Sequence, residues 1–344
     1  MKVSINGALL DQTHTGSGQY TGQLAAHLQG VDLAIARPPG PLGDLGKLRW
    51  EQRDWPRAAR RDGADLLHSP YFALPLFRHL PAVVTIHDLI PMILPAYRPS
   101  AKVRAYTWLQ AVACRSAAAI IVDSQYSKHD VLRLLHVPDD RVHVVYLGVE
   151  PRFSPDRAGP PPLDVPYVFY IGGLDQRKNL PALLFAFAEI APQHPNLILA
   201  IAGAAGTNPA TFPSLAEPAA ASGDRVRFLG RVSDDEKLAL YRHAELFVFP
   251  SLYEGFGLDP LEALACGCPV VCSDATSLPE IVGDAGILIN ALDPARLAQA
   301  MLAALADPEP LRAKGPRQAA RFTWERTAEQ TLAVYERVFS AARR

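Results

Sequence analysis

The stretch Ser251-Leu-Tyr-Glu-Gly-Phe-Gly-Leu-Asp-Pro-Leu-Glu262 joins a glycine-containing loop to the signals that begin a helix. The apolar run before it, residues 245–250, is typical of a short buried strand that ends at a proline. Gly255 and Gly257 permit a tight turn and let a ligand approach the main chain without interference from a Cβ atom. The stretch therefore predicts a strand, a ligand-accessible loop and then a helix.

The predicted helix carries signals for both of its ends. Asp259 is expected to be the N-cap, Pro260 the first helical residue, and Glu262 the third, which completes a capping box with Asp259. Gly267 is expected to stop the helix. The exposed N-terminus of such a helix can hold an anion on its free N–H groups and its positive dipole end.

Two carboxylates, Glu254 and Glu262, bracket the predicted anion site. Helix capping alone could explain Glu262, and a solvated turn could explain Glu254. Together with the glycines, their spacing resembles the Glu-x7-Glu signature of the retaining family-4 glycosyltransferases. That resemblance implies the GT-B fold, in which two Rossmann-like domains face a central cleft.

The composition is that of a globular protein with about two domains. The chain has 344 residues, 49% of them hydrophobic, and a formal net charge of −1, which gives no global attraction to nucleic acid. No apolar run approaches the roughly 18 residues of a membrane span, and the first residues show no signal-peptide pattern. A cytoplasmic protein is therefore expected. Its cysteines are expected to be free and buried, at Cys114, Cys266, Cys268 and Cys272.

Strand and helix patterns alternate twice, which predicts an α/β protein with two doubly wound parallel sheets. The proline-dense segment 151–166 reads as a linker, and the predicted domains are 1–155 and 163–325. The last helix, about 326–344 and starting near Trp324, resembles the segment that crosses back to the N-domain in this family. Strands are expected at 2–6, 65–69, 82–86, 118–122 and 141–145, and then at 167–171, 197–202, 226–229, 245–250, 270–272 and 287–289.

The loop 13–22 after the first strand contains Gly16 and Gly18. It half-resembles a dinucleotide fingerprint, but the third glycine is displaced to Gly22 and the expected acidic residue is not evident. A dehydrogenase is therefore a weak alternative, and an ordinary flexible loop is another. The family resemblance implies instead that this loop approaches the donor diphosphate and the acceptor.

The strand 82–86 ends in the polar pair His87 and Asp88. In an open parallel sheet, ligands bind at the carboxyl ends of the strands. For His87 a packed histidine at a strand end is the alternative interpretation. The segment 50–61 is basic and contains two tryptophans. It leaves open a weak peripheral contact with the inner face of a membrane, although a solvated helix face is the favoured interpretation.

In the second half, Gly172-Gly173 precedes Arg177 and Lys178. Two cations and the N–H groups of a glycine loop suit a diphosphate, while a solvated positive turn is the alternative. The segment resembles the glycine loop and Arg-Lys pair of the family. The segment 230–232 resembles the one that meets the nucleotide base.

The resemblance implies a role for each carried-over residue. Arg177 and Lys178 would neutralise the diphosphate and stabilise the leaving group. Glu262 would accept hydrogen bonds from the ribose, and Glu254 would hold hydroxyls of the transferred sugar. His87 would contact that sugar from the N-domain side. The catalytic set is His87, Asp88, Glu254, Arg177 and Lys178, and the donor-binding set is Gly16, Gly18, Gly173, Arg177, Lys178, Gly230, Val232, Glu254, Gly255, Phe256, Gly257, Leu258 and Glu262.

The resemblance also implies the reaction. A hexose would pass with retention from a nucleotide-diphosphate donor, GDP-mannose or UDP-glucose, to a saccharide or polyprenol-linked acceptor in surface-polysaccharide assembly. Front-face attack is expected, with the leaving phosphate taking the acceptor's proton. No cofactor and no metal is expected, since no Asp-x-Asp motif sits at a strand end.

Two positions depart from the family pattern. Asp259 stands where many relatives carry Pro, and Gln19 where Arg is frequent, so one expected cation near the phosphates is missing. The alternatives of other classes are a nucleotide-sugar epimerase and a non-catalytic sugar-binding protein. An epimerase lacks the Glu-x7-Glu pair, and a periplasmic binding protein needs a signal peptide.

Overall fold

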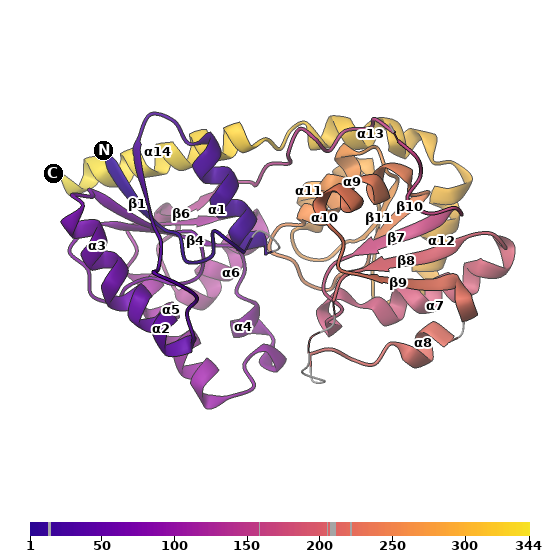
Figure 1. Cartoon of the computed structure of the whole chain (residues 1–344), viewed down its shortest axis with the longest axis horizontal. Coiled ribbons are helices and arrows are strands. Elements are labelled where there is room, and N and C mark those ends of the chain that lie inside the picture. The colour runs from indigo at the N-terminus through magenta and orange to yellow at the C-terminus, as the bar shows by residue number, and fades with distance from the viewer. Residues whose placement is uncertain (13–14, 158, 205, 207–210, 221) are drawn as a thin grey trace. The chain divides into compact units, whose positions relative to one another are not determined.

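The computed structural model describes residues 1–344 except 13–14, 158, 205, 207–210 and 221 (Figure 1). It divides into two compact units. The first consists of Met1–Gly148 and Thr323–Arg344, and the second of Val149–Phe322. The change of unit at residues 148 and 149 lies earlier than the predicted linker. The predicted α/β class with two parallel sheets is confirmed.

The first unit contains a six-stranded parallel sheet in the order β2-β1-β3-β4-β5-β6. The strand β2 (Asp32–Ala36) was not predicted. It is an edge strand that pairs with β1 (Lys2–Asn6), and its residues are exposed or half-buried, so it lacks a strongly apolar run. The other strands are β3 (Leu66–Ser69), β4 (Ala82–Ile86), β5 (Ala119–Val122) and β6 (Val142–Val144).

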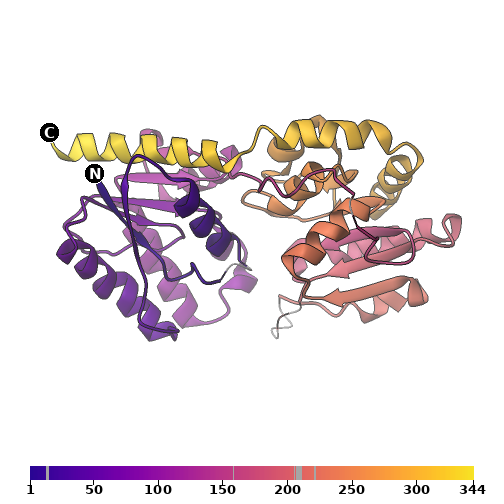
Figure 2. The ribbon, with the colours of Figure 1, turned by 45° about the horizontal axis from the view of Figure 1, so that its top comes forward.

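Helices lie on both faces of this sheet (Figures 1 and 2). The C-terminal helix α14 (Trp324–Ala342) belongs to this unit and packs against α1 (Gly16–His27). The other helical segments are α2 (Asp44–Arg49), the π-helix η1 (Trp50–Asp54), α3 (Trp55–Arg61), α4 (Ile90–Ile93), η2 (Pro95–Tyr97), α5 (Ala101–Arg115), α6 (Gln125–Leu135) and η3 (Asp139–Arg141).

The segment 50–61 is a partly buried pair of helical turns, not a fully solvated face. Trp50 and Trp55 are buried, and their indole N–H groups donate to Asn6 Oδ1 (2.8 Å) and Ser4 Oγ (3.1 Å). The arginines of the segment remain exposed. The two tryptophans are therefore part of the core and are not presented to a membrane surface.

The second unit contains a six-stranded parallel sheet in the order β12-β11-β10-β7-β8-β9. Its strands are β7 (Tyr167–Ile171), β8 (Ile198–Ala202), β9 (Val226–Gly230), β10 (Leu246–Phe249), β11 (Val270–Ser273) and β12 (Ile287–Ile289). The bounds of β7 and β12 are those predicted. Four of these strands are almost wholly apolar and buried, as parallel strands covered on both faces must be.

The helices of the second unit include α7 (Leu180–Ile190), which is apolar nearly all round and packs against α12 (Pro294–Ala306). In the same unit, α10 (Leu258–Ala265) packs against α13 (Glu309–Ala319). The remaining segments are η4 (Gln176–Lys178), η5 (Ala191–Gln193), α8 (Ala216–Ala220), η6 (Gly223–Arg225), α9 (Asp234–His243), α11 (Leu278–Val282) and η7 (Gly283–Ala285).

The first part of the proline-dense segment is not a free linker. Phe153 is buried, and the Arg242 guanidinium of α9 donates to the carbonyl oxygens of Arg152 (2.9 Å) and Ser154 (3.1 Å). This part of the segment therefore belongs to the second unit.

Candidate functional site

Three glycines stand side by side at the carboxyl edge of the second sheet. Gly172, Gly203 and Gly230 close the neighbouring strands β7, β8 and β9, and all three have positive φ. The Gly203 N–H donates to Gly230 O (2.7 Å), and a Cβ on Gly203 would overlap the Gly172 carbonyl. This edge of the sheet therefore requires glycine for close backbone packing. Gly203 was missed by the sequence reasoning, although a glycine directly after a buried strand was a visible signal.

Helix α10 begins differently from the prediction. Gly257 is its N-cap, at φ +116°, and the helix starts at Leu258 without a side-chain cap. The predicted capping box between Asp259 and Glu262 is therefore wrong. The left-handed turn at Gly257 lets the helix begin two residues early, so Asp259 already lies in its first turn. The predicted stop is confirmed, since the helix ends at Ala265 and Gly267 adopts a positive φ.

Glu254 is the centre of a charge cluster on the loop before α10. Its Oε1 accepts hydrogen bonds from Arg177 Nη1 (2.8 Å), Lys178 Nζ (2.7 Å) and Ser251 Oγ (2.5 Å). Burial raises the pKa of Glu254, but Lys178 and Arg177 lower it further, so the net shift is below the ordinary value. The structure thus brings together three residues predicted for one site, and it adds Ser251.

The two cations of this cluster are fixed by more than Glu254. Arg177 Nη1 also donates to the carbonyl oxygen of Tyr253 (2.7 Å). The Lys178 ammonium lies 4.5 Å from the centre of the Phe249 ring, and its side chain is only 8% exposed. Both groups are thereby held in place beside the start of α10. Oriented cations near a helix N-terminus favour negatively charged groups, and here they already bond the Glu254 carboxylate.

Glu262 pairs with Lys237 of α9, a partner that sequence reasoning missed. Lys237 Nζ lies 2.9 Å from both carboxylate oxygens, and the Glu262 side chain is 2% exposed. Burial lowers the pKa of Lys237, but Glu262 raises it further, so the net shift is above the ordinary value. The ammonium also lies 5.1 Å from the Phe153 ring centre. A separation of 25 residues left no local signal for this pair.

Asp259 occupies the first turn of α10 and lies between Glu254 and Glu262 in the sequence. Burial raises its pKa above the ordinary value, while Lys178 and Lys237 act in the opposite direction. At this position many relatives carry Pro, so the carboxyl group in the first turn of α10 is a departure from the family pattern.

The loop that carries Glu254 is anchored by residues after β11. The Ser277 hydroxyl donates to the carbonyl oxygens of Glu254 (3.1 Å) and Phe256 (2.7 Å). The Glu254 N–H donates to Thr276 Oγ1 (3.0 Å), and Thr276 is held at φ +58°. A β-branched residue at positive φ is uncommon and costs on the order of 1–3 kcal/mol. Thr276 and Ser277 are thus supports of the site that the sequence did not reveal.

The other predicted donor-binding residues lie at loop ends of the second unit. A Cβ on Gly173 would lie 2.8 Å from the Asp175 carboxylate, which accepts from the Arg177 N–H (3.2 Å). Gly255 and Phe256 are buried. Val232 is half-buried in the turn after β9.

The remaining predicted residues lie in the first unit. Gly16 is the exposed first residue of α1, whereas a Cβ on Gly18 would overlap the Gln12 carbonyl. Gly18 therefore has a packing role. Asp88 Oδ1 accepts from the N–H of Ile90 (2.9 Å), the first residue of α4, whose N-cap is Leu89. Of the loop 13–22, Thr13 and His14 lie outside the described residues.

His87 follows β4 directly and is largely enclosed. Its Nδ1 lies 2.6 Å from Asp123 Oδ2, and its Nε2 lies 3.1 Å from the Pro70 carbonyl oxygen. The Tyr20 ring meets it edge-on at 4.9 Å between ring centres. Asp123 and Tyr20 were not predicted as site residues.

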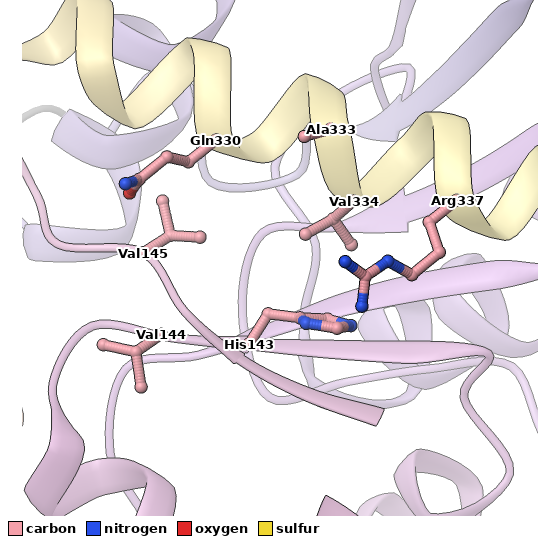
Figure 3. Close-up of a pocket in the computed structure, with 7 residues that line it drawn as sticks. All are labelled: His143, Val144, Val145, Gln330, Ala333, Val334 and Arg337. Carbon is pink, nitrogen blue, oxygen red and sulfur yellow. The ribbon is translucent and has the colours of Figure 1, made fainter. Parts of the chain in front are cut away.

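A separate pocket of about 210 Å³ lies between β6 and α14 in the first unit. Figure 3 shows His143 of β6 and the Arg337 guanidinium of α14 close together, with Val334 beside them. The field of Arg337 and Lys128 adds to burial in lowering the pKa of His143. None of the predicted site residues lines this pocket.

The four cysteines are free and buried, as predicted. Burial raises the pKa of Cys268 to about 12 and that of the other three as well, so their thiols are inert at neutral pH. Within the described residues, no group of three or more His, Cys, Asp or Glu side chains is placed to hold a metal ion. Among the described helices, none combines the length and apolar character needed to cross a bilayer.

Both halves of the chain are similar to known glycosyltransferases. Residues 155–321 match the family model of glycosyl transferases group 1, and residues 15–153 match that of glycosyltransferase family 4. The O-antigen chain mannosyltransferase B of Escherichia coli is 36% identical over 293 residues, which cover 81% of this chain and 76% of that protein. The serotype-specific mannosyltransferase WbdA of Escherichia coli is 29% identical over 287 residues, covering 76% of this chain and 34% of that longer protein.

A solved structure shares the fold. Sucrose-phosphate synthase from Thermosynechococcus elongatus superposes with a TM-score of 0.75 at 23% identity, and the match covers 99% of this chain and 100% of that chain. At this identity the likeness is one of architecture. It confirms the predicted GT-B fold of two Rossmann-like units.

Proposed function

The chain belongs to the glycosyltransferases described by the group 1 and family 4 models, and we propose that it transfers a hexose with retention from a nucleotide-diphosphate sugar to a saccharide or polyprenol-linked acceptor. The observation that carries this proposal is the cluster of Arg177, Lys178 and Glu254 at the start of α10. Buried cations arranged around one carboxylate at a helix start suit a charged phosphate group beside a polyhydroxylated one.

The donor diphosphate binds at the two cations. Arg177 and Lys178 are already oriented, so binding costs little reorganisation, and their charge meets the negative charge that develops on the leaving phosphate. Glu254 stands in for part of that anion when no donor is bound. When the donor binds, the Glu254 carboxylate accepts hydrogen bonds from hydroxyls of the transferred sugar.

The ribose contact involves Glu262. In the structure this carboxylate is buried and paired with Lys237, which fixes its orientation. A carboxylate has about four acceptor positions, so the Lys237 ammonium does not exhaust them. A ribose hydroxyl at the start of α10 could share Glu262 with Lys237.

The acceptor attacks the front face of the sugar, which is the face that the phosphate leaves. Glu254 and Glu262 are both held by cations, so neither is a free nucleophile of the kind that retaining hydrolases use. The acceptor hydroxyl therefore attacks from the side of the leaving group, and a leaving phosphate oxygen takes its proton. Arg177 and Lys178 stabilise the departing diphosphate.

GDP-mannose is the favoured donor, with mannose as the transferred sugar. UDP-glucose, which would transfer glucose, is second. Both Escherichia coli relatives are named mannosyltransferases, and one of them is an O-antigen chain mannosyltransferase. By this likeness, the acceptor is a growing saccharide in surface-polysaccharide assembly.

The direct test is a donor panel with the purified full-length chain. GDP-mannose, UDP-glucose and the matching free nucleotides are screened by thermal shift, and a ligand at 100 times its Kd should stabilise the protein by about 2.7 kcal/mol. The best donor is then incubated with mannose-containing oligosaccharides, and the anomeric configuration of the product is read by NMR. Absence of any stabilising nucleotide sugar, or an inverted product, would contradict the proposal.

Activity is expected to survive chelation. The charge of the diphosphate is balanced by Arg177, Lys178 and the start of α10, so a metal ion has no required role in this proposal. Initial rates are compared before and after EDTA treatment and gel filtration. A chelated sample that is inactive and recovers with Mg²⁺ or Mn²⁺ would refute this expectation.

A further inference from the structure

His87 has acceptors on both ring nitrogens. A carbonyl oxygen carries no hydrogen, so the 3.1 Å contact to Pro70 O requires a proton on Nε2. The 2.6 Å contact from Nδ1 to Asp123 Oδ2 has the length of a charge-assisted hydrogen bond. A ring that donates from both nitrogens is an imidazolium.

Asp123 is deeply buried and is committed to this pair. It follows β5, the neighbour of β4 in the sheet, and its side chain is 1% exposed. Its second oxygen, Oδ1, has no hydrogen-bond partner within the described part of the chain. A buried carboxylate with so few partners is costly unless a cation lies beside it. The structure supplies that cation as His87.

The other neighbours of His87 in the described ranges are neutral or acidic. Tyr20 and His68 belong to a buried chain of hydrogen bonds. Tyr335 of α14 bonds His68 Nδ1 (2.6 Å), His68 Nε2 bonds the Thr85 hydroxyl (2.9 Å), and that hydroxyl bonds Tyr20 (3.0 Å). Burial and the His87 charge lower the pKa of His68 to about 3, and burial raises that of Tyr20, so neither is charged near pH 7.

Among the described residues, the charges that face His87 therefore come from two carboxylates, Asp123 and the adjacent Asp88. Burial lowers the pKa of His87, but Asp123 and, more weakly, Asp88 and the Pro70 carbonyl raise it further, and the net shift is upward. The pair thus stabilises the fold fully below the ordinary histidine value of about 6.5, and this contribution is lost as the pH rises through the folded-state value.

We infer that Asp123 is a positioning residue that holds His87 as a fixed imidazolium at the carboxyl edge of β4, so that His87 acts as a cation and not as a general base. The inference rests on the proposed function, because it assigns His87 a part in hexose transfer. Any substrate group that meets this edge of the sheet meets a positive charge backed by a buried carboxylate. The proton of the acceptor hydroxyl must then go elsewhere, which agrees with its transfer to the leaving phosphate.

The protonation state can be measured without substrate. Full-length protein with ¹³C- and ¹⁵N-labelled histidine is titrated by NMR, and the His87 signal is assigned by its loss in His87→Gln. In the wild type, the titration midpoint of His87 is expected to lie above the ordinary value of about 6.5. Asp123→Asn should lower its titration midpoint by at least one pH unit, a tenfold change in proton affinity. A wild-type midpoint at or below 6.5, or one that Asp123→Asn leaves in place, would overturn the inference.

A matched control removes another buried carboxylate of the same unit. Asp130 of α6 is buried and pairs with Arg133 (2.6 Å), not with His87. Asp130→Asn should leave the His87 midpoint unchanged, and an equal shift in this variant would show a general effect of destabilisation and overturn the inference. If Asp123→Asn does not fold, Asp123→Glu replaces it and should retain a raised midpoint.

Kinetics with the best nucleotide sugar test the link to the reaction. Asp123→Asn should lower kcat at least tenfold with donor KM changed less than threefold, and its alkaline loss of activity should begin at lower pH. Asp123→Glu should recover part of the activity. An NMR midpoint that moves while kcat and the pH profile stay unchanged would overturn the positioning role. A chain that transfers no hexose would instead refute the proposed function, and the NMR result would stand by itself.

Discussion

Glu254→Gln is expected to lower turnover by about 100-fold while a nucleoside diphosphate binds at least as tightly as to the wild type. A charged hydrogen bond to a sugar hydroxyl contributes about 1.5–3 kcal/mol, and the amide loses that charge. In the unliganded protein, however, the amide also removes the carboxylate charge that Arg177 and Lys178 share, while Asp175 stays 3.5 Å from Arg177. A diphosphate then supplies the missing negative charge without displacing Glu254. Donor kinetics and calorimetric titration with GDP and UDP measure the two effects.

The matched control is Ser251→Ala, which removes the neutral donor to the same carboxylate oxygen. It should change turnover by less than tenfold and should not strengthen nucleotide binding. A Glu254→Gln variant that binds GDP and UDP ten times more weakly would show that Glu254 organises the cations for the phosphate and does not compete with it.

The loss of stability caused by Glu254→Gln should depend on pH. Because the folded-state pKa of Glu254 lies below the ordinary value of about 4.3, its ion pairs stabilise the wild type above that pH. The stabilisation is lost as the pH falls through the folded-state value. The gap in unfolding free energy between wild type and Glu254→Gln should therefore narrow from pH 6 to pH 3.5, as chemical denaturation at each pH can measure.

The sequence could identify Glu254, Arg177 and Lys178 as residues of one site, because each lies in a short motif at a loop. It could not show that the glutamate bonds directly to both cations, since 76 and 77 residues separate them. Such contacts depend on the order β10-β7 in the sheet, which places the two loops side by side. Local pattern carries no record of that order.

Breaking the Lys237–Glu262 pair should cost about 3 kcal/mol of stability, and replacing both partners should restore most of it. Glu262→Gln or Lys237→Met removes one charge of a buried ion pair and leaves the other, which typically costs about 3–5 kcal/mol. In Lys237→Met with Glu262→Gln, neither charge of the pair remains. Denaturant titration of the wild type, the two single variants and the double variant gives the coupling energy.

Donor KM, measured for the same four proteins, separates the functional role of Glu262 from its contribution to stability. Every variant that lacks the Glu262 carboxylate should show a raised donor KM, including the stable double variant. Lys237→Met should show a smaller rise because the carboxylate remains. A double variant with wild-type donor kinetics would reduce Glu262 to a structural ion-pair partner and would remove it from the donor site.

The prediction of the fold succeeded where strands were strongly apolar and buried. The strand Ala82–Ile86 and the strand Tyr167–Ile171 have the predicted bounds. Asp32–Ala36 escaped prediction because an edge strand needs little apolar character. The prediction of a capping box was wrong because Gly257, at φ +116°, is the N-cap and moves the helix start. A glycine can adopt this conformation, but its presence in the sequence does not show that it does.

The first unit is interrupted in the chain, and this has a consequence for biosynthesis. Residues Val149–Phe322 separate its main part from α14, whose Tyr335 bonds to His68 in the core and whose Thr327 bonds to the Tyr146 carbonyl. During translation the second unit is complete before the first, although its first residue is made later. A chain released before Thr323 should therefore carry one finished unit and one open core that exposes Tyr20 and His68. Since both chain ends lie close together in Figures 1 and 2, a permuted gene that begins at Thr323 and joins Arg344 to Met1 would reverse this order of completion. Its first unit would close on the ribosome as soon as Gly148 emerged.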